Sequence, residues 1–565
     1  MRLPRWWIIF VVAAVVFLPA VRTKLLLDDY LHVAMTEGTF PAKRGMFDLY
    51  DFVSDDVRPE LFDRGLLPWW AHPRLTIRFF RPLASALLWI DHRVFSHAPL
   101  PMHLHSVLWW IIAVVAARAL FKRTLPERPA TIATAIFALA PCHAMPLAWL
   151  ANREALMALA IGIGALVAHA RWRETMNAGR AAVAALLFAA SLSCGGEYAL
   201  ALGGYVLAME LVERRPITRR FVGLLPFVVP ALAYLVVRWK LGYGALGSGF
   251  YTDPVRSPEA FLREVPWRVV ALIGEGWLTI DTRDWLSPTA QAIFGVIVVV
   301  ALFVALFVAR RAIAHRDDGV KRAARWMTIG SLFALVPTLA VMPAPRVLGA
   351  AMVGVAGVVA LVLDYAWFGD VVGRRGAREL VQTTAVILGF AHLVHAPAAS
   401  FLWSREFFGD STRIAASAKA LRERVPDGAE IGVVRGTIGM FFAPFALDAR
   451  GRTPPRWTVL SETGHVLAIR RSPTALELIA PTGRSLFPVA AGSLLRAPEA
   501  RFRTGDVVDL PGMRATMVDV GDAGPRDVLF TFDRDISQIA WIQERYFEWP
   551  DAPLPFIGFG APYDP

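Results

Sequence analysis

Residues 6–30 read WWIIFVVAAVVFLPAVRTKLLLDDY, an apolar stretch that ends in two aspartates. Its apolar part, about Trp6 to Leu27, is long enough to cross a bilayer of about 30 Å at about 1.5 Å per residue. The chain starts with basic residues, but no small-residue cleavage site follows the apolar core, so we expect an uncleaved anchor. The stretch therefore predicts a first transmembrane helix with Asp28 and Asp29 at its exit.

The rest of the chain repeats this apolar pattern. Of the 565 residues, 56% are hydrophobic, which exceeds the share in an ordinary soluble domain. Together with the first stretch, the apolar runs predict about eleven transmembrane helices of about 20 residues each, some of them completed by flanking residues. The further runs are 107–117, 130–140, 155–168, 181–192, 199–209, 221–237, 294–309, 329–341, 347–363 and 381–393.

The net charge of +12 could suggest a nucleic-acid partner, but the basic residues concentrate in alternate short loops. This distribution is typical of the positive-inside rule, so we expect no nucleic acid and a cytoplasmic N-terminus. With an odd number of spans, the C-terminus lies outside the cytoplasm, as does the acidic pair. We expect a bacterial inner (plasma) membrane protein. The basic groups fall in residues 118–128, 171–180, 214–220, 310–325 and 374–378.

The chain is expected to divide into a transmembrane module, residues 1–398, and an extracytoplasmic β-rich domain, residues 399–565. Two outer loops, about 28–102 and 239–288, interrupt the module. Each contains an amphipathic segment, 80–95 and 261–280, that we expect to lie flat on the membrane. The tail alternates short apolar and polar runs between turn residues, which predicts strands at 465–470, 475–480, 506–510, 516–520 and 527–532.

The only cysteines, Cys142 and Cys194, both fall near expected outer ends of spans. That compartment permits a disulfide. The interpretation that we favour is two isolated buried thiols.

Three side chains with acid/base chemistry follow the first span. Asp28, Asp29 and His32 have the spacing that places the first and last on one face of a helix. A carboxylate there can act as a general base on a membrane-bound substrate. The alternative is a helix cap at the start of a solvated loop. A divalent metal is a further alternative, although a metal site needs more ligands than this cluster supplies.

Further polar residues fall at other expected outer edges of the membrane. Each alone is typical of an interface anchor or a capped helix end. Together they supply a carboxylate and guanidinium groups, which bind phosphate in a bidentate manner. A lipid phosphate would suit this set: Arg81, His143, Arg153, Glu197 and Arg346.

The order of these motifs resembles the GT-C superfamily of polytopic glycosyltransferases, in particular the transmembrane O-mannosyltransferases that carry TPR repeats and their bacterial relatives. The match covers about residues 7–366, and this chain lacks TPR repeats. Departures from the family pattern are Ala140, Met145, Gly195-Gly196 and Val347. The matching positions are Leu27-Asp28-Asp29-Tyr30, Phe80-Arg81-Pro82-Leu83, His103-Leu104, Pro141, His143, Trp149, Arg153, Glu197, Arg346 and Leu348.

The resemblance implies a GT-C-like fold and transfer of a sugar, with inversion, from a polyprenyl-phosphate donor to an extracytoplasmic acceptor such as a protein, lipid or glycan. In this interpretation Asp28 or Asp29 is the base, and Arg81, His143, Arg153, Glu197 and Arg346 bind substrate. No cofactor is implied. Two alternatives stay open: a flippase or transporter of lipid-linked sugars, and an inactive GT-C-like scaffold whose tail binds a partner.

Overall fold

The computed structural model describes residues 6–213, 215–281, 288–371, 374–424, 428–436, 441–448, 456–463, 466–487 and 492–542. By the contacts among its residues, the chain divides into two compact units. The first unit contains Met1–Thr23, Phe80–Gly242 and Pro258–Phe408. The second contains Lys24–Phe79, Tyr243–Ser257 and Gly409–Pro565. The boundary expected at residue 398 stays a prediction.

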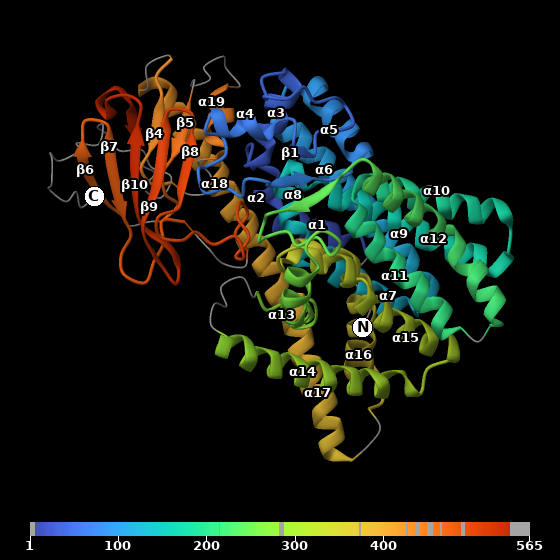
Figure 1. The fold of residues 1–565 in the computed structure, drawn as a ribbon. Coiled ribbons are helices and arrows are strands. Elements are labelled where there is room, and N and C mark those ends of the chain that lie inside the picture. Colours follow the sequence, from blue (N-terminus) through green and yellow to red (C-terminus); the bar gives the residue numbers. More distant parts are fainter. Residues whose placement is uncertain are drawn as a thin grey trace. The chain divides into compact units, whose positions relative to one another are not determined.

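The first unit is built of helices (Figure 1). Its longer helices are α5 (Pro82–Phe95), α6 (Pro99–Thr124), α7 (Glu127–Ala138), α9 (Glu154–Thr175), α10 (Ala178–Cys194), α11 (Gly196–Val212), α12 (Ile217–Lys240), α13 (Pro258–Leu278), α14 (Pro288–Ala314), α15 (Asp318–Phe333), α16 (Gly349–Phe368), α17 (Arg375–Phe390) and α18 (Ala396–Arg424), the last of which continues into the second unit. The shorter helical segments are α1 (Ile8–Val16), α2 (Leu18–Val21), η1 (Pro141–His143), α8 (Ala144–Ala148), η2 (Leu150–Asn152), η3 (Val336–Ala340), η4 (Pro345–Leu348) and the π-helical turn η5 (Ala391–His395).

Seven helical stretches among the described residues are long and apolar enough to cross a membrane, or eight if the bent pair Glu127–Ala138 and Pro141–Ala148 forms one span. The predicted polytopic helical membrane protein is therefore confirmed, whereas the expected count of about eleven spans is not. Some of the apolar runs form helices shorter than the roughly 20 residues that a span needs. Both α10 and α11, for example, have 17 residues.

The first apolar stretch does not form one continuous helix. It contains α1 and the single turn α2, with the break at Phe17. Pro19 explains the break, because a proline has no N–H for the helical ladder and its ring clashes with the preceding turn. The prediction of a single spanning helix from Trp6 to Leu27 is wrong in this respect.

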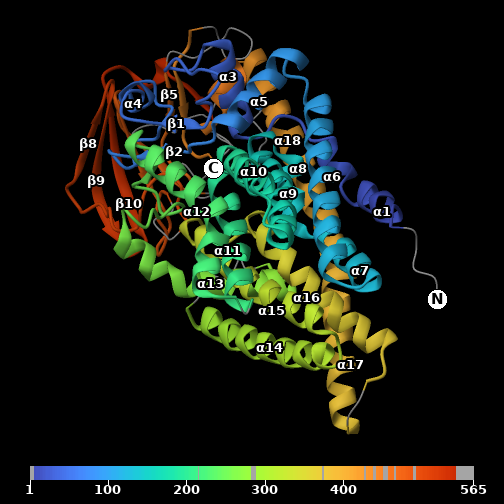
Figure 2. The same ribbon diagram turned by 90° about the vertical axis from the view of Figure 1, so that its right-hand side faces the viewer.

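Helix α16 is the centre of the first unit, since the apolar window of Pro345–Phe368 is completely buried. Figure 2 shows α14, α15, α16 and α17 close together. A side chain at Gly354 or Gly357 would collide with Met327 of α15, so these glycines permit close helix packing. The Tyr205 hydroxyl of α11 donates to the backbone carbonyl of Ala350, 2.8 Å away. Small residues and one buried hydroxyl thus fix the helices that surround α16.

The second unit combines helices and sheets. Its helices are α3 (Asp28–Glu37), α4 (Arg58–Asp63) and α19 (Ala443–Asp448). Strands β6 (Leu467–Ser472), β7 (Ala475–Ile479), β10 (Gly524–Phe532), β9 (Met513–Gly521) and β8 (Val507–Leu510) form an antiparallel sheet in that order, visible in orange and red in Figure 1. A second antiparallel sheet joins β1 (Asp51–Val53), β2 (Thr76–Arg78) and β3 (Gly244–Leu246). A parallel sheet joins β11 (Ala540–Ile542), β4 (Ile431–Val433) and β5 (Trp457–Val459).

The predicted β-rich tail is confirmed, because the strands of the five-stranded sheet coincide with the alternating runs in the sequence. Segment 24–79 packs against that tail through a buried aromatic cluster. Trp69 Nε1 donates to the carbonyl of Leu460 at 3.0 Å, and the Trp70 ring stacks on Phe487 with centroids 5.0 Å apart. Helices also form in the two amphipathic segments, as α5 and α13, and their position on the membrane surface stays a prediction.

Candidate functional site

The acidic pair opens helix α3 of the second unit. The residue before it, Leu27, has a φ of +46°, a left-handed conformation that is uncommon for a side chain other than glycine. Strained residues of this kind concentrate at functional sites. Asp29 is fully buried, and its Oδ2 accepts a hydrogen bond of 2.9 Å from the Leu26 N–H, while Asp28 is partly exposed. The two adjacent carboxylates thus differ in their surroundings, since Asp29 is buried and Asp28 is partly exposed.

His32, one turn further along α3, is buried between aromatic rings. Its ring centroid lies 5.2 Å from that of Tyr50 and 5.5 Å from that of Phe52. Among the described residues there is no group of three or more His, Cys, Asp or Glu side chains that could hold a metal ion. The packing of His32 indicates that it supports the helix that carries the acidic pair.

In the first unit, Arg81 bridges two carboxylates. Its Nη1 lies 3.1 Å from Glu154 Oε1, and its Nη2 forms an ion pair with Glu197. Arg346 is close enough to interact electrostatically with both carboxylates. Arg81, Glu197 and Arg346 are predicted site residues, and the structure brings these three together around Glu154, which is not among the predicted site residues.

Each of these four side chains lies at the start of a helical segment. Arg81 precedes Pro82, the first residue of α5, and Glu154 is the first residue of α9. Glu197 lies in the first turn of α11, and Arg346 lies in η4, directly before α16. A carboxylate in the first turn interacts favourably with the helix dipole, which also attracts anions to such ends. We call these four side chains the charged cluster.

Glu154 is the most buried member of the charged cluster, at 1% exposure. Asn152 Nδ2 donates to its Oε1 over 2.8 Å, whereas its Oε2 is buried and has no hydrogen-bond partner in the described part of the chain. A buried acceptor without a donor is costly, and in a native structure it points to strain, a catalytic role or a bound water or ion. This oxygen is therefore able to accept a hydrogen bond from a bound molecule.

The glycine pair before Glu197 has a steric reason. A side chain at Gly196 would overlap the hydroxyl of Tyr234 from α12. That hydroxyl donates to the backbone carbonyl of Phe80 at 3.1 Å, next to Arg81. The departure from the family pattern at Gly195-Gly196 therefore lets Tyr234 reach the segment that carries Arg81.

The structure gives Arg153 and His143 other surroundings. Arg153 is 2% exposed; it forms an ion pair with Asp91 and donates to Ser106 Oγ at 2.8 Å and to the Met102 carbonyl at 2.6 Å. His143 is buried, and its Nε2 is bonded to the carbonyl oxygen of Phe137 at 2.9 Å. Neither residue is a member of the charged cluster, and their role as substrate ligands stays a prediction.

Asp91 is a second residue that the sequence analysis did not name. Besides Arg153, it contacts His105 Nδ1 at 2.9 Å, and His105 Nε2 accepts a hydrogen bond from Trp109 Nε1 at 3.0 Å. The sequence contains one signal that could have indicated Asp91, because it is an acidic residue within the amphipathic segment 80–95. Cys142 and Cys194 are both buried, unpaired thiols, which confirms the favoured interpretation.

No protein-family model matches the chain, and no curated protein matches it. Solved structures do. ArnT from Cupriavidus metallidurans bound to undecaprenyl phosphate shares 14% identity over 80% of this chain and 85% of that one, with a TM-score of 0.42. The Archaeoglobus fulgidus oligosaccharyltransferase AglB, in complex with an inhibitory peptide and a dolichol-phosphate, shares 13% identity over 80% of this chain and 64% of that one, with a TM-score of 0.44.

Arabinofuranosyltransferase AftD from Mycobacteria shares 15% identity over 94% of this chain and 40% of that one, with a TM-score of 0.41. The chain thus spans less than two thirds of AglB and of AftD. These three proteins are GT-C glycosyltransferases.

Proposed function

We propose that this chain is a membrane glycosyltransferase that moves a sugar from a polyprenyl-phosphate donor to an acceptor outside the cytoplasm. The observation that supports it best is the charged cluster. Its four ionisable side chains lie at helix starts of a helical unit with a large apolar core, where buried charge is costly and often functional. The donor class follows from the motif resemblance.

In the proposed reaction, the acidic pair and the charged cluster have different roles. Asp28 or Asp29 takes the proton from an acceptor hydroxyl, and the hydroxyl oxygen attacks the anomeric carbon of the sugar. The bond between that carbon and the phosphate oxygen breaks, so the polyprenyl phosphate leaves with the electron pair. The configuration at the carbon inverts.

The charged cluster offers the groups that stabilise the leaving phosphate. Arg346 supplies a guanidinium next to the start of α16, where the helix dipole favours the same anion. Arg81 is held in place by Glu154 and Glu197, and Glu154 Oε2 is available to a sugar hydroxyl. Preorganised groups of this kind lower the cost of developing charge in the transition state.

The catalytic test uses purified protein in lipid nanodiscs, a panel of undecaprenyl-phosphate sugars and a panel of hydroxyl acceptors that includes a peptide, a lipid and a glycan. The measured quantity is released undecaprenyl phosphate. We expect the parent to consume at least one donor, and Asp28→Asn or Asp29→Asn to be slower by about 10²–10⁴-fold, as for loss of a general base. Asp63→Asn, at an exposed position of α4, is the matched control and should keep the parental rate.

Two results would count against the proposal. If the parent protein consumes no donor of the panel, the proposed transferase function is refuted. If both asparagine variants react at the parental rate, the transferase function stands, but the acidic pair has no part in its mechanism.

The orientation is also proposed: a cytoplasmic N-terminus, an extracytoplasmic C-terminus and a bacterial inner membrane. The alternation of basic loops supports it. A reporter that is active only outside the cytoplasm should be active when fused after Pro565 and silent when inserted within residues 310–325. The opposite pattern would place the acidic pair in the cytoplasm.

A further inference from the structure

Tyr198 is a buried side chain beside the charged cluster. It follows Glu197 in the first turn of α11 and is 1% exposed. Its phenol interacts electrostatically with all four members of the charged cluster, and its interaction with Arg346 is the strongest of the four. The phenol therefore lies close to the guanidinium that the proposed transfer assigns to the leaving phosphate.

Gly195 permits the Tyr198 ring to lie against the start of α9. A Cβ atom at Gly195 would be 3.0 Å from Cδ2 of the ring and 3.4 Å from the backbone carbonyl oxygen of Glu154. A real Cβ atom rarely has so close a neighbour, so a side chain at Gly195 would displace the ring. The glycine thus keeps Tyr198 next to the helix turn that supplies Glu154.

The Tyr198 hydroxyl has no hydrogen-bond partner among the described residues. Two other tyrosines of the first unit differ from it. The Tyr205 hydroxyl donates to the carbonyl of Ala350 at 2.8 Å. The Tyr234 hydroxyl donates to the carbonyl of Phe80 at 3.1 Å. A buried tyrosine hydroxyl usually has such a partner, because burial without one is unfavourable, so the Tyr198 O–H group is a donor that a bound molecule can use.

The groups around this donor favour an anion that also carries hydroxyl groups. Arg346 and the start of α11 attract negative charge, and a phenol O–H donates strongly to an anionic oxygen. Glu154 Oε2 can accept a hydrogen bond and has no donor in the described part of the chain. A phosphate oxygen suits Tyr198 and Arg346, and a sugar hydroxyl suits Glu154, so the set fits a sugar phosphate.

We propose that Tyr198 binds the phosphate of the polyprenyl-phosphate donor, with its hydroxyl donating to a phosphate oxygen beside Arg346. The inference rests on the proposed function, which assigns this donor to the charged cluster. Tyr198 keeps its proton throughout the transfer. Its hydrogen bond becomes stronger as negative charge develops on the leaving oxygen, so it stabilises the transition state more than the bound donor.

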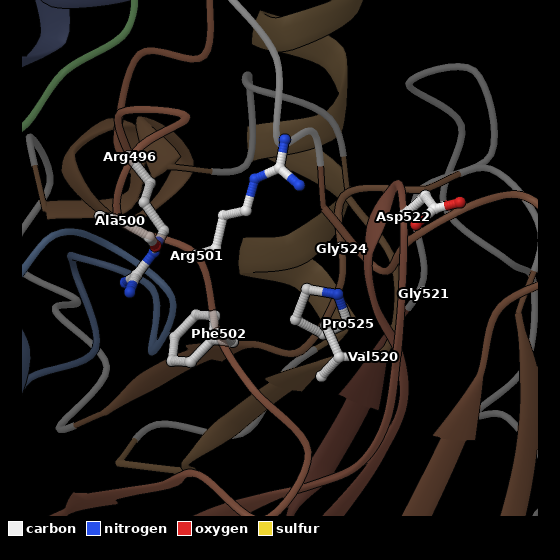
Figure 3. A pocket seen from close by; sticks show the side chains of 9 residues that line it. All are labelled: Arg496, Ala500, Arg501, Phe502, Val520, Gly521, Asp522, Gly524 and Pro525. Carbon is white, nitrogen blue, oxygen red and sulfur yellow. The ribbon is translucent and has the colours of Figure 1, made fainter.

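The pocket of the second unit differs from the charged cluster in its cations. It has a volume of about 150 Å³ and lies between the segment from Arg496 to Phe502 and the hairpin of β9 and β10 (Figure 3). The Arg496 guanidinium donates to backbone carbonyls, among them that of Trp70, and the Arg501 side chain extends to the opposite side. These two cations do not converge, so the anion site that we infer lies in the first unit.

The test compares two lipids that differ only in the phosphate. Undecaprenyl phosphate and undecaprenol are titrated into the purified full-length protein in detergent micelles, and bound lipid is quantified by native mass spectrometry. We expect the parent to prefer undecaprenyl phosphate, and Tyr198→Phe to lose at least about tenfold of that preference, as for a hydrogen bond to a charged group. Binding of undecaprenol should not change.

Tyr205→Phe is the matched control, because Tyr205 is a buried tyrosine of the same helix outside the charged cluster. The unfolding free energy should fall in Tyr205→Phe, which loses the bond to Ala350. It should stay at the parental value in Tyr198→Phe, whose hydroxyl has no partner to lose among the described residues. Release of undecaprenyl phosphate at saturating donor should be slower by at least about tenfold in Tyr198→Phe and unchanged in Tyr205→Phe.

Three results would overturn the inference: a parent that binds both lipids equally, a Tyr198→Phe variant that keeps the parental preference, or one that is destabilised as much as Tyr205→Phe. The binding measurement does not depend on turnover. A parent that prefers the phosphate but consumes no donor would refute the transferase function and still support Tyr198 as a phosphate ligand.

Discussion

Replacing Arg81 with methionine removes a cation from two carboxylates and keeps much of the side-chain volume. In the ion pair with Glu154 the two side chains are 9% and 1% exposed, whereas the Glu197 side chain is 32% exposed. Removing one partner of a buried pair costs about 3–5 kcal/mol. A pair open to solvent contributes about 1 kcal/mol or less. Arg81→Met should therefore lower the free energy of unfolding by about 3–5 kcal/mol, mainly through Glu154.

The same reasoning predicts a specific rescue. Adding Glu154→Gln to Arg81→Met removes the uncompensated buried charge and keeps the acceptor of Asn152, so most of the lost stability should return. Adding Glu197→Gln should restore little. Arg375→Met is the matched control, because the ion pair Arg375–Glu379 joins side chains that are 93% and 59% exposed. We expect it to cost about 0.5 kcal/mol or less.

The assay is reversible unfolding of the detergent-solubilised protein in mixed micelles with increasing SDS, followed by circular dichroism. The parent, the single variants and the double variants form a double-mutant cycle that isolates the coupling between positions 81 and 154. If Arg81→Met costs no more than Arg375→Met, or if Glu154→Gln fails to restore stability, then Arg81 is not the counter-ion of a buried Glu154.

Three further outcomes follow from other contacts. Asp91→Asn should destabilise the protein by up to about 3–5 kcal/mol in the same assay, because it leaves the buried Arg153 guanidinium without its carboxylate. Arg346→Lys should raise the apparent KM for the donor, and Arg346→Ala should raise it further; equal donor affinity in all three forms would make Arg346 a membrane anchor only. Burial raises the pKa of Glu462 to about 7, so the folded state holds its proton more tightly than the unfolded chain, and stability should fall as the pH rises from about 4.5 to about 7. The difference in unfolding free energy between parent and Glu462→Gln, measured across that range, should show this fall; a difference independent of pH would contradict it.

Sequence patterns predicted the strands of the tail well. The period of two in apolar residues, together with turns such as Pro511-Gly512, is local information, and β6 to β10 formed where it occurred. The short strands β1 to β5 and β11 were not predicted, because three residues carry too little periodicity. Their pairing joins segments that are far apart in the sequence. Strand β2 at residues 76–78, for example, pairs with β3 at residues 244–246.

The membrane spans show the same limit. Apolar runs identified helices such as α14 and α16, since hydrophobicity over about 20 residues is a local property. The runs could not show where one helix ends and a short one follows, as at Pro19, nor that Gly196 is small because Tyr234 fills the space above it. Such constraints come from neighbours in space.

The charged cluster illustrates that a motif does not show which of two neighbouring residues reaches a given partner. The motif resemblance implies a substrate-binding role for Arg153 and none for Glu154, although the two are adjacent at the start of α9. Successive residues of a helix point in different directions, about 100° apart around its axis. Arg153 therefore reaches Asp91, while Glu154 reaches Arg81. The motif indicates the turn at the start of α9. Only the helix geometry shows that Glu154, and not Arg153, belongs to the charged cluster.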